Sequence, residues 1–419
     1  MTPAPSARVT TDATAEPARR VAWADVAKGL CILLVVLHHV VGKHLPLVVP
    51  DTAAGAAVVQ AWVAVDTALK PVRMPLFFAV SGMFAAGALR RPWPLVAVRR
   101  VLTPYWTYLV WLAVHVVVFA TVATAIETHR VPGVLEGLTH LLLAATGVWY
   151  LYALAVYFVV AKLLLAHVTP GAAVAGAAVV SLLASWLPIE GVNRYSVVHC
   201  FVFFLAGACF PRLLAGLPRL RLPGVAALLT AYAATAAACL ALGAPKSVFS
   251  LALAPVAVVL GVQLAMAVSD RGWAGGRAAG PVAALGRRTL PVYVLHMPLL
   301  GVLHQWLVDA VYANPDHGDA VLTALRGGAA LPSGAEPRTP YLSGGVPAVV
   351  PGGGAARDGG AELLVALAWA GYPLLLVAGL VAASLLTHRA LLRLGAGWMF
   401  DLPAALRERA QRGPRLSGR

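Results

Sequence analysis

Apolar residues recur along this 419-residue chain in about ten separate blocks, each close to the roughly 20 residues that a helix needs to cross a bilayer. The blocks are residues 27–45, 71–89, 101–123, 147–166, 172–187, 197–214, 225–242, 248–268, 290–311 and 363–386. Inside a membrane every backbone polar group needs an internal partner, so blocks of this length are expected to be helices. The sequence therefore predicts an all-α integral membrane protein, a bundle of about ten transmembrane helices.

Composition agrees with this fold class, because 60% of the residues are hydrophobic and only 12% are charged. In a soluble domain, about a quarter of all residues are charged. The formal net charge of +15 would suit a nucleic-acid partner if the basic residues clustered on a polar domain, but they lie between the apolar blocks. We therefore expect the lipid bilayer as a partner and no nucleic acid. The four cysteines lie inside apolar blocks and predict neither a disulfide framework nor a metal site.

The loop charges predict an orientation. An even number of spans places both termini on one side of the membrane. Most of the 32 Lys and Arg residues fall in segments on that side, including residues 90–100 and the segment after residue 388. Because basic residues accumulate in cytoplasmic loops, we expect a multi-pass protein of the cell membrane with both termini in the cytoplasm.

Segments outside the spans differ in composition. Residues 1–26 are expected to form a disordered cytoplasmic arm, residues 27–392 the membrane domain and residues 393–419 a basic cytoplasmic tail. Residues 310–361 are rich in Gly and Pro and are expected to be a tolerated external loop, with a mobile lid over an external site as the alternative. Residues 55–69 are amphipathic and are expected to lie along the outer face.

Ionisable side chains at membrane depth are costly, so they indicate where function lies. At 100° per residue, Asp25, Lys28 and His39 fall within about 60° of one another on the first predicted span. His39 would lie about 16 Å further along the helix than Lys28. That stripe suits a ligand whose anionic group meets Lys28 and whose reactive end meets an imidazole, a side chain that acts as a base near neutral pH.

A purely structural interpretation remains open for the same residues. Lys28 would then be a topology charge that reaches the membrane interface, and His39 a hydrogen-bonded core residue. His38 is 100° away on the helix and is the better candidate for a structural role.

The run RVAWADVAKGLCILLVVLHH, residues 20–39, resembles the opening of the acyltransferase-3 family of multi-span membrane enzymes. Many members carry a basic residue, ten intervening residues and then histidine, a spacing that Lys28 and His39 meet. Lys in place of the more frequent Arg, with Trp23 and Asp25 before it, is closer to the fucose-4-O-acetylase-like branch. Further runs resemble the family in the expected order: RMPLFFAVSGMF (73–84), LRRPWPLVAVRRVLTPYW (89–106), VWYLYAL (148–154), HCFVFFLAG (199–207) and LGRRTLPVYVLHMPLL (285–300).

The resemblance implies an O-acyltransferase. Such an enzyme would move an acetyl or other short acyl group from acyl-CoA to a hydroxyl of a cell-envelope or exported saccharide, a glycolipid or a metabolite. Acyl-CoA would be a co-substrate, and no permanently bound cofactor or metal is expected. His39 is the candidate general base, and Asp25 would orient or balance Lys28 through an i, i+3 pair. His296 is expected near the depth of His39, with a core histidine as the alternative.

Two further groups are candidates for binding. Arg90, Arg91, Arg99 and Arg100 form a basic turn able to hold the phosphates of coenzyme A, with topology charge as the alternative. Arg73, Trp149, Tyr150 and Arg194 are candidates for binding a saccharide at the outer side, although interfacial aromatic residues occur in any membrane protein. Ser81 would raise the possibility of an acyl-enzyme, but a Ser-Gly pair in a span more often serves close helix packing.

A second class of function fits the same residues. A transporter or flippase of a glycan or lipid intermediate would use Lys28 and His39 as ligands or as a proton relay. The chain shows no obvious paired half-repeats with broken helices, which weighs against this alternative.

Overall fold

The computed structural model describes residues 22–49, 53–121, 147–186, 193–275, 279–312 and 359–412. Throughout these ranges the regular elements are helices, as the apolar blocks predict. The predicted arm up to residue 21, the predicted external loop from residue 313 to 358 and the predicted tail beyond residue 412 lie outside the described residues.

The helices show a multi-pass membrane protein. Within the described ranges, 7 helical segments are long and apolar enough to cross a membrane: Trp23–Val48, Ala53–Leu89, Trp93–Thr121, Leu222–Ala241, Lys246–Asp270, Thr289–Leu307 and Leu367–Arg393. Three other predicted spans are shorter helices, namely α7 (Trp149–Leu164), α8 (Pro170–Leu183) and α9 (Arg194–Cys209). These helices have 16, 14 and 16 residues. Because about 20 residues are needed to cross a bilayer, the predicted number of ten spans is not confirmed.

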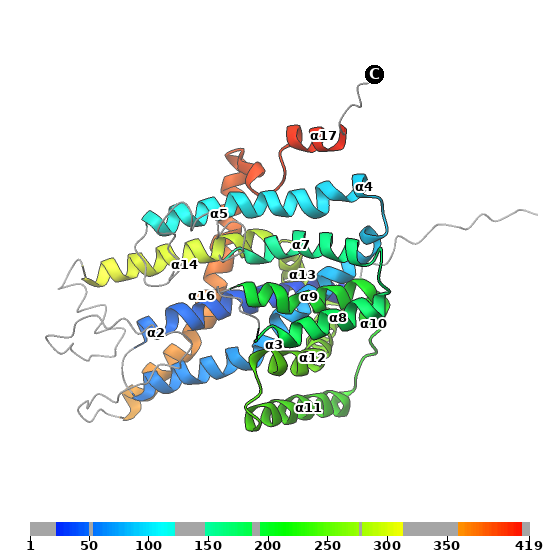
Figure 1. The fold of residues 1–419 in the computed structure, drawn as a ribbon. Coiled ribbons are helices and arrows are strands. Elements are labelled where there is room, and N and C mark those ends of the chain that lie inside the picture. The colour runs from blue at the N-terminus through cyan, green and yellow to red at the C-terminus, as the bar shows by residue number, and fades with distance from the viewer. Residues whose placement is uncertain are drawn as a thin grey trace, which may run out of the picture.

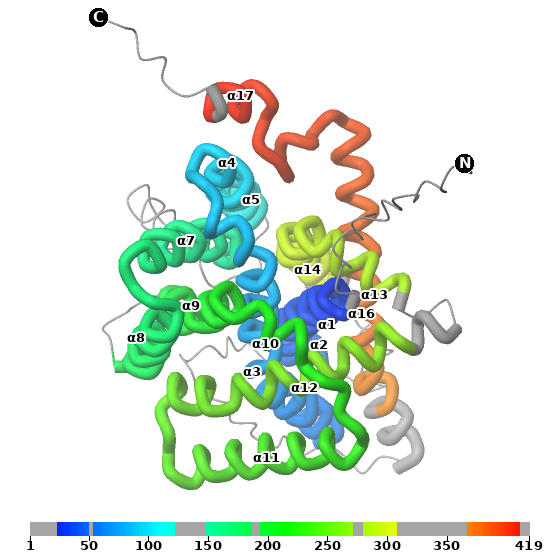
Figure 2. Tube along the Cα trace, turned by 90° about the vertical axis from the view of Figure 1, so that its right-hand side faces the viewer, coloured from blue at the N-terminus to red at the C-terminus, as the bar shows by residue number. Residues whose placement is uncertain are grey.

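Helix α1 (Ala22–His39) lies near the centre of the bundle (Figure 2). Five helices contact it: α3 (Ala53–Leu89), α12 (Lys246–Gly275), α13 (Ala279–Gly286), α14 (Thr289–Tyr312) and α16 (Gly359–Arg393). Ala24, Ala27 and Ile32 are fully buried in these contacts. The polar stripe of α1 therefore faces protein, which is how a membrane protein accommodates ionisable side chains.

The chain crosses the bundle back and forth, so the loops gather at two ends (Figure 1). At one end lie α4 (Trp93–Ala97), the π-helix η2 (Val98–Leu102), which leads into α5 (Thr103–Thr121), and α10 (Pro211–Ala215). We call this the α4 end. At the other, the α2 end, α1 continues through the π-helix η1 (Val40–His44) into α2 (Leu45–Val48). Helix α11 (Leu222–Ala241) lies at the periphery beside α12 (Figure 2).

The amphipathic segment 55–69 belongs to the same helix as the second predicted span. Helix α3 runs for 37 residues from Ala53 to Leu89 and continues through Pro71 and Pro75. Each proline removes one helical hydrogen bond, a loss that packed neighbours in a membrane protein can tolerate. The expectation of a separate segment along the outer face is therefore replaced by one long helix, which carries Asp66 toward α1.

Glycines let two pairs of helices touch backbone to backbone. A Cβ atom on Gly82 of α3 would overlap the carbonyl oxygen of Phe204 on α9, and one on Gly207 would overlap that of Ala79. A Cβ atom on Gly286 of α13 would likewise overlap the carbonyl oxygen of Asp25 on α1. Small residues are what permits such close approach between membrane helices. The contact between α13 and α1 brings Arg287, the residue after Gly286, next to the start of α1.

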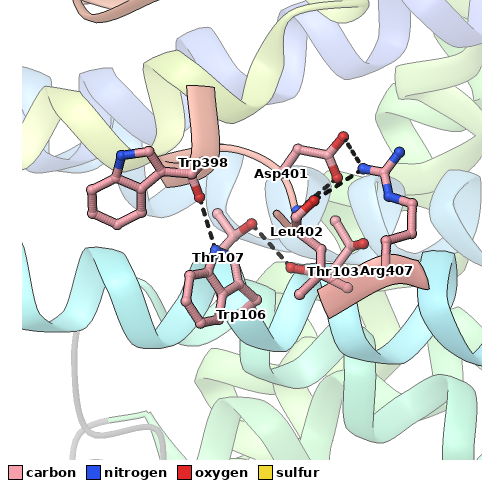
Figure 3. Close-up of polar contacts among 7 residues, drawn as sticks. All are labelled: Thr103, Trp106, Thr107, Trp398, Asp401, Leu402 and Arg407. Carbon is pink, nitrogen blue, oxygen red and sulfur yellow. Dashed lines mark hydrogen bonds and ion pairs between the residues drawn. The ribbon is translucent and has the colours of Figure 1, made fainter. Parts of the chain in front are cut away.

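The segment after α16 folds back onto α5 (Figure 3). It contains the 3-10 helix η3 (Ala396–Met399) and α17 (Ala404–Arg412). The indole Nε1 of Trp106 donates to the Trp398 carbonyl oxygen at 2.8 Å, and that of Trp111 donates to the Met399 carbonyl at 2.8 Å. This segment is therefore packed against the α4 end, where the basic turn also lies.

Candidate active site

At the α4 end, Asp25 and Lys28 form the pair that their spacing predicts. Lys28 Nζ lies 3.3 Å from Asp25 Oδ1. The Asp25 side chain is only 5% exposed, and Arg287 Nη1 lies 3.7 Å from its second oxygen, Oδ2. A buried carboxylate is stabilised by opposite charges, so Asp25 can hold two cations at one point. Arg287 was not among the predicted site residues, because nothing in the local sequence pattern connects it to α1.

The basic turn meets Lys28 through Phe84. The ammonium of Lys28 lies 4.7 Å from the centre of the Phe84 ring, a cation–π distance. Arg100 Nη2 donates to the carbonyl oxygen of the same phenylalanine at 3.1 Å. The other predicted members of this cluster, Arg90, Arg91 and Arg99, are exposed. The structure thus brings the predicted phosphate-binding arginines to the same end of the bundle as Lys28.

Further along α1, His39 meets His296 of α14. The two ring centroids are 5.1 Å apart. His296 is fully buried and its Nδ1 lies 3.0 Å from the Val292 carbonyl oxygen, so this nitrogen carries the proton and Nε2 carries the lone pair. Among the described residues, His39 Nδ1 and His296 Nε2 are buried and have no hydrogen-bond partner. Two imidazoles with unused ring nitrogens at membrane depth are an arrangement suited to proton transfer.

The backbone changes its geometry directly after His39. Helix α1 ends at His39, and η1, a π-helix, begins at Val40. Single π-helical turns inside helices occur frequently at functional sites, because the extra residue changes where the neighbouring side chains point.

His38, next to His39, is held by a carboxylate of α3. Its Nδ1 lies 2.8 Å from Asp66 Oδ2, and Arg73 Nη1 lies 3.0 Å from Asp66 Oδ1. Asp66 therefore joins His38 to Arg73, whose side chain is only 6% exposed. Arg73 was predicted as a saccharide ligand, and the structure places it in an ion pair beside the histidines.

A cavity of about 460 Å³ lies at the α2 end of the bundle. Three of the predicted site residues line it, namely His39, Arg73 and Trp149. It is also lined by residues that were not among the predicted site residues, including Lys43, Lys70, Lys246 and Ser250. The cavity is large enough for a small ligand, and the candidate base, His39, forms part of its wall.

Ser81 and Tyr150 are not among the described lining residues, but hydrogen bonds connect them to Tyr293 and Gly147, which are. Ser81 Oγ donates to the Phe77 carbonyl oxygen at 2.8 Å and lies 2.7 Å from the Tyr150 hydroxyl. The Tyr150 amide donates to the Tyr293 hydroxyl, which in turn donates to the Gly147 carbonyl oxygen. Arg194 is at the start of α9, and its Nε is buried without a hydrogen-bond partner in the described part of the chain.

His199, another histidine of the cavity wall, has a hydrogen-bond partner at each ring nitrogen. Ser181 Oγ donates to the His199 carbonyl oxygen at 3.2 Å, and it lies 2.7 Å from His199 Nδ1. Nε2 lies 2.9 Å from Ser250 Oγ, so each ring nitrogen of His199 has a hydroxyl partner. No spacing rule links residues on three helices, so only the quoted run 199–207 pointed to this histidine.

The comparisons with known proteins agree with the geometry. A family model for the acyltransferase domain of the acyltransferase-3 type matches residues 21–388. Inner membrane protein YcfT of Escherichia coli (strain K12) is 27% identical over 319 residues, which cover 72% of this chain and 86% of YcfT. No solved structure matches the chain. The match extends over most of the helical bundle and includes Asp25, Lys28, His39 and His296, and the chain therefore belongs to the acyltransferase-3 family of membrane acyltransferases.

Proposed function

We propose that this protein transfers an acetyl or other short acyl group from acyl-CoA to a hydroxyl of a cell-envelope or exported saccharide, a glycolipid or a secreted metabolite. The observation that carries the proposal is the position of His39. It lines a ligand-sized cavity at one end of the bundle, on the same helix that carries Lys28 toward the other end. One helix thus presents a cation for the donor and an imidazole for the reaction.

The donor would bind from the α4 end. Lys28, Arg100 and the exposed arginines of the basic turn supply charge-assisted hydrogen bonds for the phosphates of coenzyme A. Asp25 keeps Lys28 in place, so we assign Asp25 a positioning role. The thioester end would reach along α1, because Lys28 and His39 are about 16 Å apart along a helix axis.

The reaction would then be a direct acyl transfer. His39 takes the proton of the acceptor hydroxyl as its oxygen attacks the thioester carbonyl carbon. The carbon–sulfur bond breaks, and the coenzyme A thiolate leaves with that proton as the free thiol. His296 Nε2 has an unused lone pair on a ring 5.1 Å from that of His39, and after a rotation of the His39 ring it would accept a His39 N–H and leave the other His39 nitrogen to act as the base.

This assignment includes an orientation. With the α4 end in the cytoplasm, the basic turn and both termini face the pool of acyl-CoA, and the cavity faces the outer side where exported acceptors pass. Trp23 and Lys28 favour the fucose-4-O-acetylase-like branch within the family.

The test is release of coenzyme A thiol from acetyl-CoA by the purified protein in lipid nanodiscs when acceptor is supplied. His39→Ala should abolish the acceptor-dependent release, and His167→Ala, at an exposed histidine in the turn after α7, should not. A fully active His39→Ala protein would exclude the assigned base. Movement of acceptor across the bilayer without thiol release would favour a transporter instead.

A further inference from the structure

The wall of the cavity carries an unusual amount of positive charge. Lys43, Lys70, Arg73 and Lys246 all line it, and none of the described residues of its lining is Asp or Glu. Of the basic residues that the structure describes at the α2 end, these four line the cavity and only Arg194 does not. Basic residues at this end oppose the positive-inside bias under the proposed orientation, so a topological role does not explain them.

Asp66 pairs with Arg73, and among the described residues no carboxylate forms an ion pair with Lys70 or Lys246. Asp66 pairs with Arg73 at 3.0 Å and with His38 at 2.8 Å. Lys70 and Lys246 are exposed at the cavity, on α3 and at the start of α12. Both therefore bring a positive charge to the same cavity. Two like charges beside one partly apolar cavity raise its potential and attract an anion.

Lys246 also lies against an aromatic part of the cavity wall. The Lys246 ammonium lies 4.6 Å from the centre of the Tyr195 ring, and Trp149 lines the same cavity. An aromatic face next to a cation suits a ligand that has both a sugar ring and a negative charge. His39 lies further inside on α1, where it is half-buried.

We infer that the acceptor of this enzyme carries an anionic group, a phosphate or a carboxylate, which Lys70 and Lys246 bind while the reacting hydroxyl reaches His39. The identification of the ligand as the acyl acceptor rests on the proposed function, but the anion site itself does not depend on catalysis. It places acidic saccharides and phosphate-linked sugars ahead of neutral glycans as substrates. Charge recognition away from the reacting atoms also fixes which hydroxyl reaches the base.

Binding can be measured without turnover. Full-length protein in nanodiscs of phosphatidylcholine, a lipid without net charge, would be titrated calorimetrically with glucose 1-phosphate, glucuronic acid and glucose. We expect at least one of the acidic sugars to bind about tenfold or more tightly than glucose, and to weaken as salt rises. The two acidic probes distinguish a phosphate from a carboxylate.

Matched variants assign the site. Lys70→Gln combined with Lys246→Gln should weaken the acidic sugar about tenfold, whereas Lys70→Arg with Lys246→Arg should keep binding. Arg212→Gln combined with Arg389→Gln removes the same charge from exposed positions on α10 and α16 and should change nothing. Equal binding of all three sugars, no binding of either acidic sugar, or an unaffected Gln variant would overturn the inference. Lysine-dependent binding in a protein that never releases coenzyme A would refute the proposed reaction and leave the anion site standing.

Discussion

His39 and His296 meet ring to ring, with centroids 5.1 Å apart, although they come from the first and one of the last helices of the family domain. The contact gives each imidazole a neighbour that can hold or exchange a proton. It also explains why a histidine on α14, a helix far away in the sequence, belongs to the site on α1.

Loss of either imidazole should affect catalysis differently. We expect His39→Gln to lower kcat by about 10²- to 10⁴-fold, because it removes the base, and His296→Phe to lower it about tenfold, because it removes only the group that orients the base. The pH dependence of kcat should change in the second variant while the KM for acetyl-CoA stays the same. Steady-state thiol release across pH checks this, and a His296→Phe protein with an unchanged kcat and pH profile would contradict the assigned role.

Lys28 should act on the donor. Lys28→Met should raise the KM for acetyl-CoA about tenfold or more, because a charge-assisted hydrogen bond to phosphate is lost, and Lys28→Arg should restore it. The substrate S-acetylpantetheine lacks the nucleotide and its phosphates. Its KM should therefore be the same for Lys28→Met and the wild-type protein, and an equal increase for both donors would show that Lys28 does not bind phosphate.

Two glycines of α3 provide a matched pair for stability. Gly82→Ala places a methyl group against the Phe204 carbonyl oxygen of α9, so we expect a loss of about 1–3 kcal/mol in the free energy of unfolding. Gly87→Ala meets no atom within 4 Å and should be neutral or stabilise the helix by about 0.5–1 kcal/mol. Denaturation in detergent micelles compares the two, and equal effects would mean that the α3–α9 contact is looser than described.

Ser81 should not carry the acyl group. Its hydroxyl proton is donated to the Phe77 carbonyl oxygen, and its neighbour at 2.7 Å is a tyrosine hydroxyl, which is not a base at neutral pH. We expect Ser81→Ala to keep most of the thiol release and to lose about 1 kcal/mol of stability with the hydrogen bonds. Mass spectrometry of the protein after incubation with labelled acetyl-CoA checks this, since an acetyl group on Ser81 would establish an acyl-enzyme.

Hydropathy was enough to predict the helices, because a bilayer permits few other structures for long apolar blocks. Each predicted block corresponds to a helix, and the stripe of Asp25, Lys28 and His39 lies on one continuous helix as the periodicity predicts. Hydropathy could not decide how many of these helices span the membrane. The three short helices α7, α8 and α9 are apolar. Hydropathy alone does not locate their ends, and so it does not give their lengths.

The partners of the stripe could not be predicted. Arg287 reaches Asp25 because Gly286 lets α13 touch the backbone of α1, and Asp66 reaches His38 because α3 extends beyond its predicted start. Both contacts depend on how helices cross, which the spacing within a single helix does not contain. The same holds for Lys70 and Lys246, which meet only at the cavity.

The central position of α1 sets the order in which the site can be built during biosynthesis. A ribosome makes this helix before α13 and α14, which come more than 200 residues later in the chain. Until then Asp25, Lys28 and His39 have neither Arg287 nor His296 beside them, although exposing such groups to lipid is costly. Catalytic competence must therefore arise late, when α13 and α14 insert against a helix that was made much earlier.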